Sequence, residues 1–90
     1  MRLILYSKPG CHLCEGLEGK LKQIETPKFD LEIRDITTSE DWFTAYQYEI
    51  PVLRLELPEG EKTIPRFSPR MSVDRLAQQL DKYLQLSDDE

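Results

Sequence analysis

The two cysteines of this 90-residue chain, Cys11 and Cys14, are separated by only two residues. The apolar run Leu3–Tyr6 precedes them, and apolar residues recur at helical spacing after them. This pattern predicts a buried strand that turns into a helix at the cysteine pair. The free N–H groups and the positive dipole end of a helix favour a thiolate over a thiol. We therefore expect Cys11 at or just before the helix start as the activated sulfur. Cys14 would lie about one turn further in, close enough to form a disulfide.

The size and composition of the chain restrict the classes of protein to which it can belong. A chain of 90 residues with 39% hydrophobic and 32% charged residues fits one globular α/β domain. We place this domain at residues 1–86 and an acidic tail at residues 87–90. The net charge of −5 argues against a nucleic-acid partner, and the apolar runs are too short to cross a membrane. In the absence of a signal-peptide pattern we expect a monomer in the cytoplasm. Closely spaced cysteines in cytoplasmic proteins tend to be catalytic, redox-sensing or metal-binding.

Hydrophobic periodicity predicts alternating strands and helices along the chain. The run at residues 2–6 is apolar on both faces, which indicates a central strand, whereas residues 29–34 alternate and indicate an edge strand. Pro65 would confine the last strand to an edge or a bulge. The predicted elements in order are a strand at 2–6, a helix at 11–25, a strand at 29–34, a short helix that ends near Tyr46, strands at 52–57 and 62–67, and a helix after Ser72.

The order β-α-β-α-β-β-α, with C-x-x-C at the first strand-to-helix turn and Ile50-Pro51 before the third strand, resembles the thioredoxin superfamily. The stretch Tyr6-Ser7-Lys8 shortly before the cysteines is similar to the opening of glutaredoxins and of a glutaredoxin-like family. The resemblance implies a thioredoxin-like fold with a four-stranded mixed sheet in the order 2-1-3-4. It also implies that the first and third helices cover one face of this sheet and that the second helix covers the other.

The same resemblance implies a glutaredoxin-like thiol–disulfide oxidoreductase and a role for each matching residue. Cys11 would attack a protein disulfide or a glutathione mixed disulfide, and Cys14 would resolve the intermediate. Lys8 matches the lysine that approaches the glycyl carboxylate of glutathione. Pro51 matches the superfamily's cis-proline, and Ile50 before it would present its backbone to an extended substrate.

Two stretches depart from the glutaredoxin pattern. The residues between the cysteines are His12 and Leu13, and an imidazolium at position 12 would favour the thiolate, although His12 can equally be an exposed helix-start residue. Where glutaredoxins carry a Gly-Gly turn and an Asp for the γ-glutamyl group, this chain has residues 67–71, Phe-Ser-Pro-Arg-Met. Arg66 or Arg70 could supply a substitute anion contact, or both could be solvated surface charges.

Two alternatives to an oxidoreductase stay open from the sequence. One is a metal or iron–sulfur protein, although Cys11, His12 and Cys14 supply at most three of the four ligands of a closed zinc site. The other is a non-catalytic thioredoxin-fold module that binds or senses. For the leading hypothesis we expect no bound metal or cofactor, and glutathione or a disulfide-containing protein as the partner.

Overall fold

The computed structural model describes residues 2–88, with side chains described through residue 84. The first half of this region contains β1 (Arg2–Ser7), α1 (His12–Gln23), β2 (Asp30–Asp35), a 3₁₀ turn (Ile36–Thr38) and α2 (Glu40–Tyr46). The second half contains β3 (Val52–Leu57), β4 (Gly60–Thr63) and α3 (Val73–Asp88). Within residues 2–88 the strands form a four-stranded mixed sheet with the order β2-β1-β3-β4, as predicted.

Strand β1 lies at the centre of the sheet and is covered on both faces. It pairs in parallel with β2 and antiparallel with β3, so Leu3 is opposite both Leu31 and Leu55. The side chains of residues 3–7 are all buried, which agrees with the run of apolar residues there. Strand β2, in whose sequence apolar and charged residues alternate, lies at one edge of the sheet, also as predicted.

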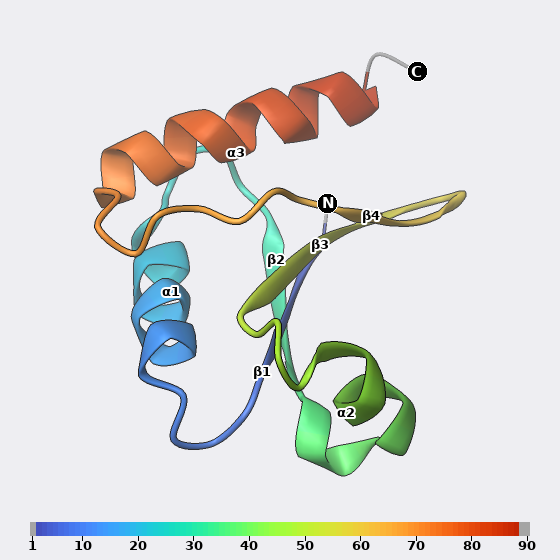
Figure 1. Cartoon of the computed structure of the whole chain (residues 1–90). Coiled ribbons are helices and arrows are strands. Elements are labelled where there is room, and N and C mark those ends of the chain that lie inside the picture. The colour runs from blue at the N-terminus through green and yellow to red at the C-terminus, as the bar shows by residue number, and fades with distance from the viewer. Residues whose placement is uncertain (1, 89–90) are drawn as a thin grey trace.

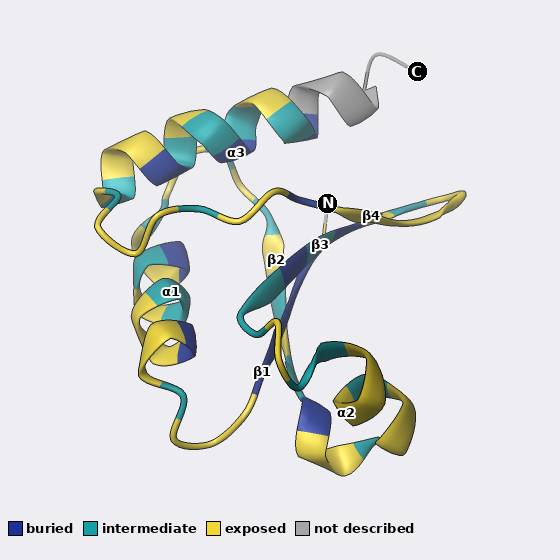
Figure 2. Cartoon of the chain, in the orientation of Figure 1, coloured by how far each residue is buried: buried dark blue, intermediate teal, exposed yellow. Residues whose placement is uncertain are grey.

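The helices cover the two faces of the sheet in the predicted arrangement (Figure 1). Helices α1 and α3 pack on one face, and α2 lies against the other near the end of β1. The main core lies between the sheet and the α1–α3 pair, and Figure 2 shows its buried residues along β1 and β3 and on the inner sides of both helices. Its buried members are Leu3, Leu5, Leu21, Leu53, Leu55, Ile64, Leu76, Leu80 and Leu84.

The prediction of a strand at residues 62–67 was wrong, because β4 runs from Gly60 to Thr63. The hairpin loop is shorter than expected: Leu57 pairs directly with Gly60, whose φ of +134° is accessible to glycine and strained for other residues. After Thr63, the Ile64 N–H still donates to the Leu53 carbonyl, at 3.0 Å, but Pro65 has no N–H to continue the ladder. The chain therefore leaves the sheet at this point, and β4 is the predicted edge strand in a shifted position.

Other element boundaries differ from the predictions by a few residues. Helix α1 ends at Gln23 and not at Glu25, and α3 continues through Asp88. The first two residues of the predicted acidic tail at 87–90 therefore lie in α3, whereas the last two lie outside the described residues. Ser39 is the N-cap of α2, and Ser72 accepts a hydrogen bond from the Arg75 N–H at the start of α3, as expected from their capping chemistry.

On the α2 face, Arg34 joins the edge strand β2 to the centre of the sheet. Its guanidinium pairs with Glu32 and donates to the Tyr6 hydroxyl at 2.8 Å, and its Cζ lies 5.2 Å from the centroid of the Trp42 ring. The Tyr6 hydroxyl in turn donates to Glu61 at 3.3 Å. Burial raises the pKa of Tyr6, while the hydrogen bond from Arg34 opposes that rise. Arg34 and Glu61 thus cover Tyr6 together with the aromatic side chains of the short helix α2.

We expect the domain to lose stability as the pH falls below about 5, since two β2 carboxylates favour the ionised form in the folded chain. A hydrogen bond from Arg34 lowers the pKa of Glu32, and hydrogen bonds from Thr37 lower the pKa of Asp35. Their stabilisation is present above the unfolded-state pKa values of about 4 and is lost as the pH falls through the folded-state values. Urea unfolding at a series of pH values measures this decrease. A Glu32→Gln variant should show a shallower decrease, and an unchanged slope would contradict this role of Glu32.

Replacing Gly19 by alanine is expected to stabilise the domain. Gly19 is exposed in the middle of α1, and a Cβ atom added there would meet no atom within 4 Å. Alanine is favoured over glycine in a helix interior by about 1 kcal/mol, so the free energy of unfolding should rise by about that amount. Urea denaturation of Gly19→Ala against the wild type measures this change. A loss of stability would show that the open space around Gly19 does not govern its effect.

Candidate functional site

The turn between β1 and α1 places the two cysteines as the sequence predicted. Gly10 has a φ of +83°, a left-handed conformation that glycine adopts at little cost, and it directs the chain from the sheet into the helix. Cys11 is the N-cap of α1, and its sulfur accepts a hydrogen bond from the Cys14 N–H at 3.2 Å. Cys11 and Cys14 form a disulfide with their Cα atoms 5.3 Å apart.

The two sulfurs differ in their access to solvent. Cys11 is half-buried at the helix start, whereas Cys14 is 2% exposed and faces the interior. In thiol–disulfide exchange the attacking sulfur must reach the substrate in line with the bond that breaks. Cys11 is therefore the cysteine that an external disulfide can approach, and Cys14 is placed to react with Cys11 itself.

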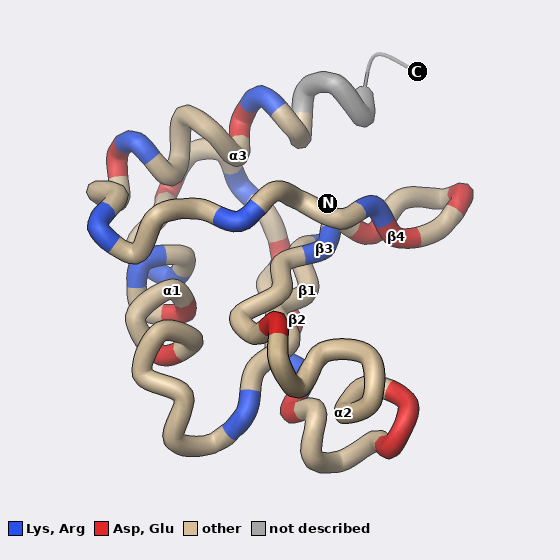
Figure 3. The backbone as a smooth tube through the Cα atoms, in the orientation of Figure 1, with Lys and Arg blue, Asp and Glu red and all other residues tan. Residues whose placement is uncertain are grey.

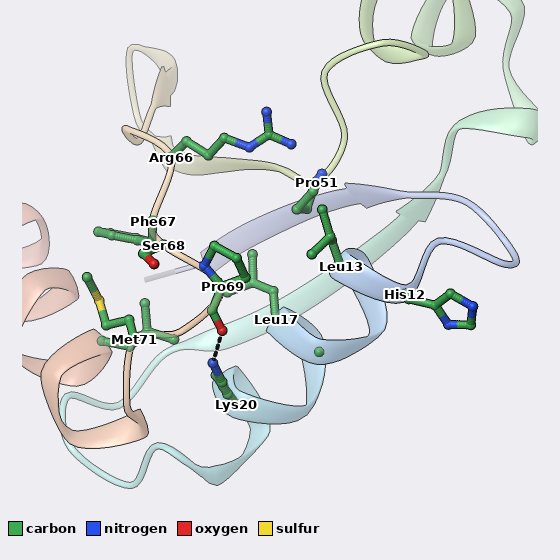
Figure 4. A pocket seen from close by; sticks show the side chains of 12 residues that line it. His12, Leu13, Leu17, Lys20, Pro51, Arg66, Phe67, Ser68, Pro69 and Met71 are labelled. Carbon is green, nitrogen blue, oxygen red and sulfur yellow. Dashed lines mark hydrogen bonds between the residues drawn. The ribbon is translucent and has the colours of Figure 1, made fainter.

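The segment Ile50-Pro51 lies beside the start of α1, and its peptide bond is cis. Pro51 borders the same groove as His12 and Leu13 from the helix (Figure 4). Both backbone groups of Ile50 already have partners: its N–H donates to the Tyr46 carbonyl at 3.1 Å, and its carbonyl accepts from Arg66 Nη2 at 3.0 Å. An extended substrate that pairs with Ile50 would thus share its carbonyl with Arg66 or displace the guanidinium.

His12 and Lys8, the two other residues singled out from the sequence, flank the disulfide on different sides. The His12 side chain is 94% exposed, with Nδ1 3.6 Å from Glu15 Oε2, and its ring points away from the groove (Figure 4). Lys8 is exposed and lines a separate hollow together with Cys14 and Asp35. The groove therefore brings Pro51 together with His12 and Leu13, the two residues between the cysteines, whereas Cys14 borders the other hollow with Lys8.

The groove lies between α1 and the connection from β4 to α3, and it has a volume of about 250 Å³. Leu13 and Leu17 form its helix wall, and Phe67, Pro69 and Met71 form the opposite wall (Figure 4). The Lys20 ammonium donates to the Pro69 carbonyl at 2.6 Å and fastens the connection to α1. The residues between β4 and α3, where the Gly-Gly turn of glutaredoxins was missing from the sequence, thus form an apolar wall.

The contact between Arg66 and Ile50 was not predicted from the sequence. Sequence reasoning singled out Arg66 only as a candidate anion contact, and no local pattern signals that its side chain reaches the Ile50 carbonyl. The contact depends on where the chain runs after it leaves the sheet at Pro65. To predict this contact from the sequence, the end of β4 would have had to be predicted correctly.

Among the described residues, no group of three or more His, Cys, Asp and Glu side chains is arranged to hold a metal ion. None of the described helices is long and apolar enough to span a membrane.

Comparison with known proteins gives a consistent result across nearly the whole chain. The family model of the glutaredoxin-like domain (DUF836) matches residues 2–81. The solved structure of target protein XcR50 from X. campestris is similar at 31% sequence identity with a TM-score of 0.60, over 89% of this chain and 96% of that one. Thioredoxin 1 from Thermosipho africanus TCF52B is similar in fold, with a TM-score of 0.66 at 19% identity over 98% of this chain and 99% of that one. No curated protein matches the sequence significantly.

Proposed function

The chain belongs to the glutaredoxin-like domain family, and we propose that it is a thiol–disulfide oxidoreductase in which Cys11 and Cys14 alternate between dithiol and disulfide. The observation that carries this proposal is the unequal exposure of two sulfurs joined at a helix start. Cys11 is accessible as the N-cap of α1, and Cys14 is buried directly behind it. A structural disulfide would have no need of this asymmetry, whereas exchange with a second molecule depends on it.

In the proposed reaction, the reduced protein transfers two electrons to a substrate disulfide. The Cys11 thiolate, favoured by the free N–H groups and dipole of α1, attacks one substrate sulfur. A bond forms between Cys11 and that sulfur, the substrate disulfide breaks, and the first substrate thiolate leaves and takes a proton from solvent. Cys14 then loses its proton and attacks the Cys11 sulfur, which forms the Cys11–Cys14 disulfide and releases the second substrate thiol. A thiol reductant must reduce this disulfide before the next cycle.

The other site residues have supporting roles in this proposal. Ile50 and Pro51 would contact the substrate beside Cys11, and the Lys8 ammonium would attract an anionic group near the dithiol. Protonated His12 would favour the Cys11 thiolate, so a His12→Gln variant should have a less oxidising disulfide. A cytoplasmic setting, where thiol reductants keep cysteines reduced, suits a protein that acts as the electron donor.

The proposal is tested by mixing the fully reduced protein with a disulfide-bonded peptide and following both partners by mass spectrometry. We expect one peptide disulfide to be reduced for each Cys11–Cys14 disulfide that forms, because both steps occur within one protein molecule. Protein alkylated at both thiols before mixing is the control and should leave the peptide oxidised. Peptide that stays oxidised in the presence of reduced protein would contradict the proposed function.

A further inference from the structure

We propose that the groove beside the dithiol binds a bulky apolar side chain next to the target cysteine of a protein disulfide, and that Arg66 selects a carboxylate in the same segment. This inference rests on the proposed function and names its substrate class. The substrate would be an extended segment in which the cysteine has an apolar neighbour and an acidic residue beyond it.

The groove has the lining of a site for an apolar side chain. Leu13 is 52% exposed although it is a large hydrophobic residue, and Phe67 and Met71 pack against the core from the other wall. Covering such surface with another apolar group removes it from water and favours binding. The volume of about 250 Å³ is smaller than the roughly 300–1,000 Å³ of small-molecule sites. It therefore suits one or two side chains better than a whole small molecule.

The groove begins at the residues between the two reactive cysteines. Leu13 lies between Cys11 and Cys14 in the helix, and Pro51, next to Ile50, borders the groove (Figure 4). Neighbouring residues of an extended chain are only about 3.3 Å apart along its axis. A side chain one or two residues from a cysteine bonded to Cys11 can thus enter the groove while the backbone passes Ile50.

The charge around the groove favours an acidic partner, in contrast to the net charge of −5 for the whole chain. Lys20 and Arg66 line the groove, and none of its described lining residues is acidic. Figure 3 shows Lys and Arg on the connection between β4 and α3 and on the facing part of α1. Lys20 is engaged with the Pro69 carbonyl, whereas Arg66 is exposed and bonded to Ile50 through one nitrogen. The remaining donors of its guanidinium can bind a carboxylate.

Glutathione is the competing occupant, because it carries carboxylates and a reactive sulfur. It has no bulky apolar side chain, so it would leave the walls formed by Leu13, Leu17 and Phe67 uncovered. A peptide that combines an apolar and an acidic residue satisfies both parts of the groove. The comparison between such a peptide and glutathione therefore separates the two occupants.

The test measures how fast the reduced Cys14→Ser protein attacks mixed disulfides of peptides with 5-thio-2-nitrobenzoate. Cys11 bonds to the peptide sulfur, and the coloured thiolate leaves with the electron pair of the broken bond. The peptides Glu-Leu-Cys-Leu-Glu, Glu-Ala-Cys-Ala-Glu and Gln-Leu-Cys-Leu-Gln allow either chain direction, and the glutathione mixed disulfide is the fourth substrate. Rates with free N-acetylcysteine correct for the intrinsic reactivity of each substrate.

We expect the first peptide to react about five- to tenfold faster than the alanine peptide, from burial of the leucine side chain in a half-open groove. We expect it to react about two- to fivefold faster than the glutamine peptide, the range of an exposed ion pair. It should react about five- to tenfold faster than the glutathione mixed disulfide, which has carboxylates but no bulky apolar side chain. Leu13→Gln should reduce the preference for leucine, and Arg66→Gln should remove the preference for glutamate. Arg70→Gln is the matched control, since Arg70 is exposed on the same connection and does not line the groove.

Equal corrected rates for all substrates, or a fastest reaction with the glutathione mixed disulfide, would overturn the inference and leave the oxidoreductase function standing. A glutamate preference that survives Arg66→Gln would overturn the role of Arg66. A Cys11 thiol that reacts with none of the substrates would overturn the proposed function and the inference with it.

Discussion

Replacing Cys11 by serine is expected to abolish reduction of disulfides, whereas Cys14→Ser should accumulate a covalent adduct between Cys11 and its substrate. Serine cannot form a disulfide, and the buried Cys14 cannot take the place of the accessible Cys11 in attack on an external disulfide. Without Cys14, the mixed disulfide has no internal thiol to resolve it. Incubation of each reduced variant with a disulfide-bonded peptide, followed by intact mass, measures both outcomes.

The adduct in Cys14→Ser should be located at Cys11 by peptide mapping and should disappear on addition of a strong thiol reductant. Circular dichroism of both variants shows whether the fold is retained, which matters most for the buried position 14. An adduct on Cys14 in the Cys11→Ser variant would reverse the assigned roles. Complete loss of reaction in both variants, with no adduct in either, would contradict the division of roles between the two cysteines.

Truncating Leu80 to alanine is expected to lower the free energy of unfolding by about 3 kcal/mol, within the range of about 2–5 kcal/mol for buried leucines. Leu80 is fully buried in the main core, where α3 packs against the sheet and α1. A small domain with a total stability of about 5–15 kcal/mol would remain folded but close to its limit. Urea denaturation monitored by the fluorescence of Trp42 measures the change.

Gln78→Ala is the matched control, because Gln78 is an exposed residue of the same helix. Its substitution should change the free energy of unfolding by less than about 0.5 kcal/mol, as surface substitutions commonly do. A comparable loss in both variants would show that helix α3 responds to any substitution, and that packing of Leu80 does not account for the effect.

Elements governed by local chemistry could be predicted from the sequence. The run Leu3–Tyr6 is apolar on both faces and forms the central strand, and the alternation at residues 29–34 corresponds to the edge strand β2. The serines that cap α2 and α3 have side chains that satisfy the first free N–H groups of each helix. The position of Cys11 and Cys14 at the start of α1 follows from the same local rules.

The features that depend on contacts between distant segments could not be predicted in this way. The end of β4 is set by its register with β3, and that register begins at the tight turn before Gly60. The apolar groove combines Leu13 and Leu17 with Phe67, at least 50 positions away in the sequence. Each of these residues has an ordinary helical or loop environment when considered alone. The contact of Arg66 with the Ile50 carbonyl likewise appears only when both segments are placed in space.

The most direct test of the redox role of Cys11 and Cys14 is equilibration of the pure protein in graded mixtures of reduced and oxidised glutathione. Alkylation of free thiols and intact mass then give the fraction of each redox state. We predict one two-electron transition between the dithiol and the Cys11–Cys14 disulfide, with a midpoint within the range that the glutathione mixtures cover. Cysteines that stay reduced across the whole range would contradict a redox function for this pair.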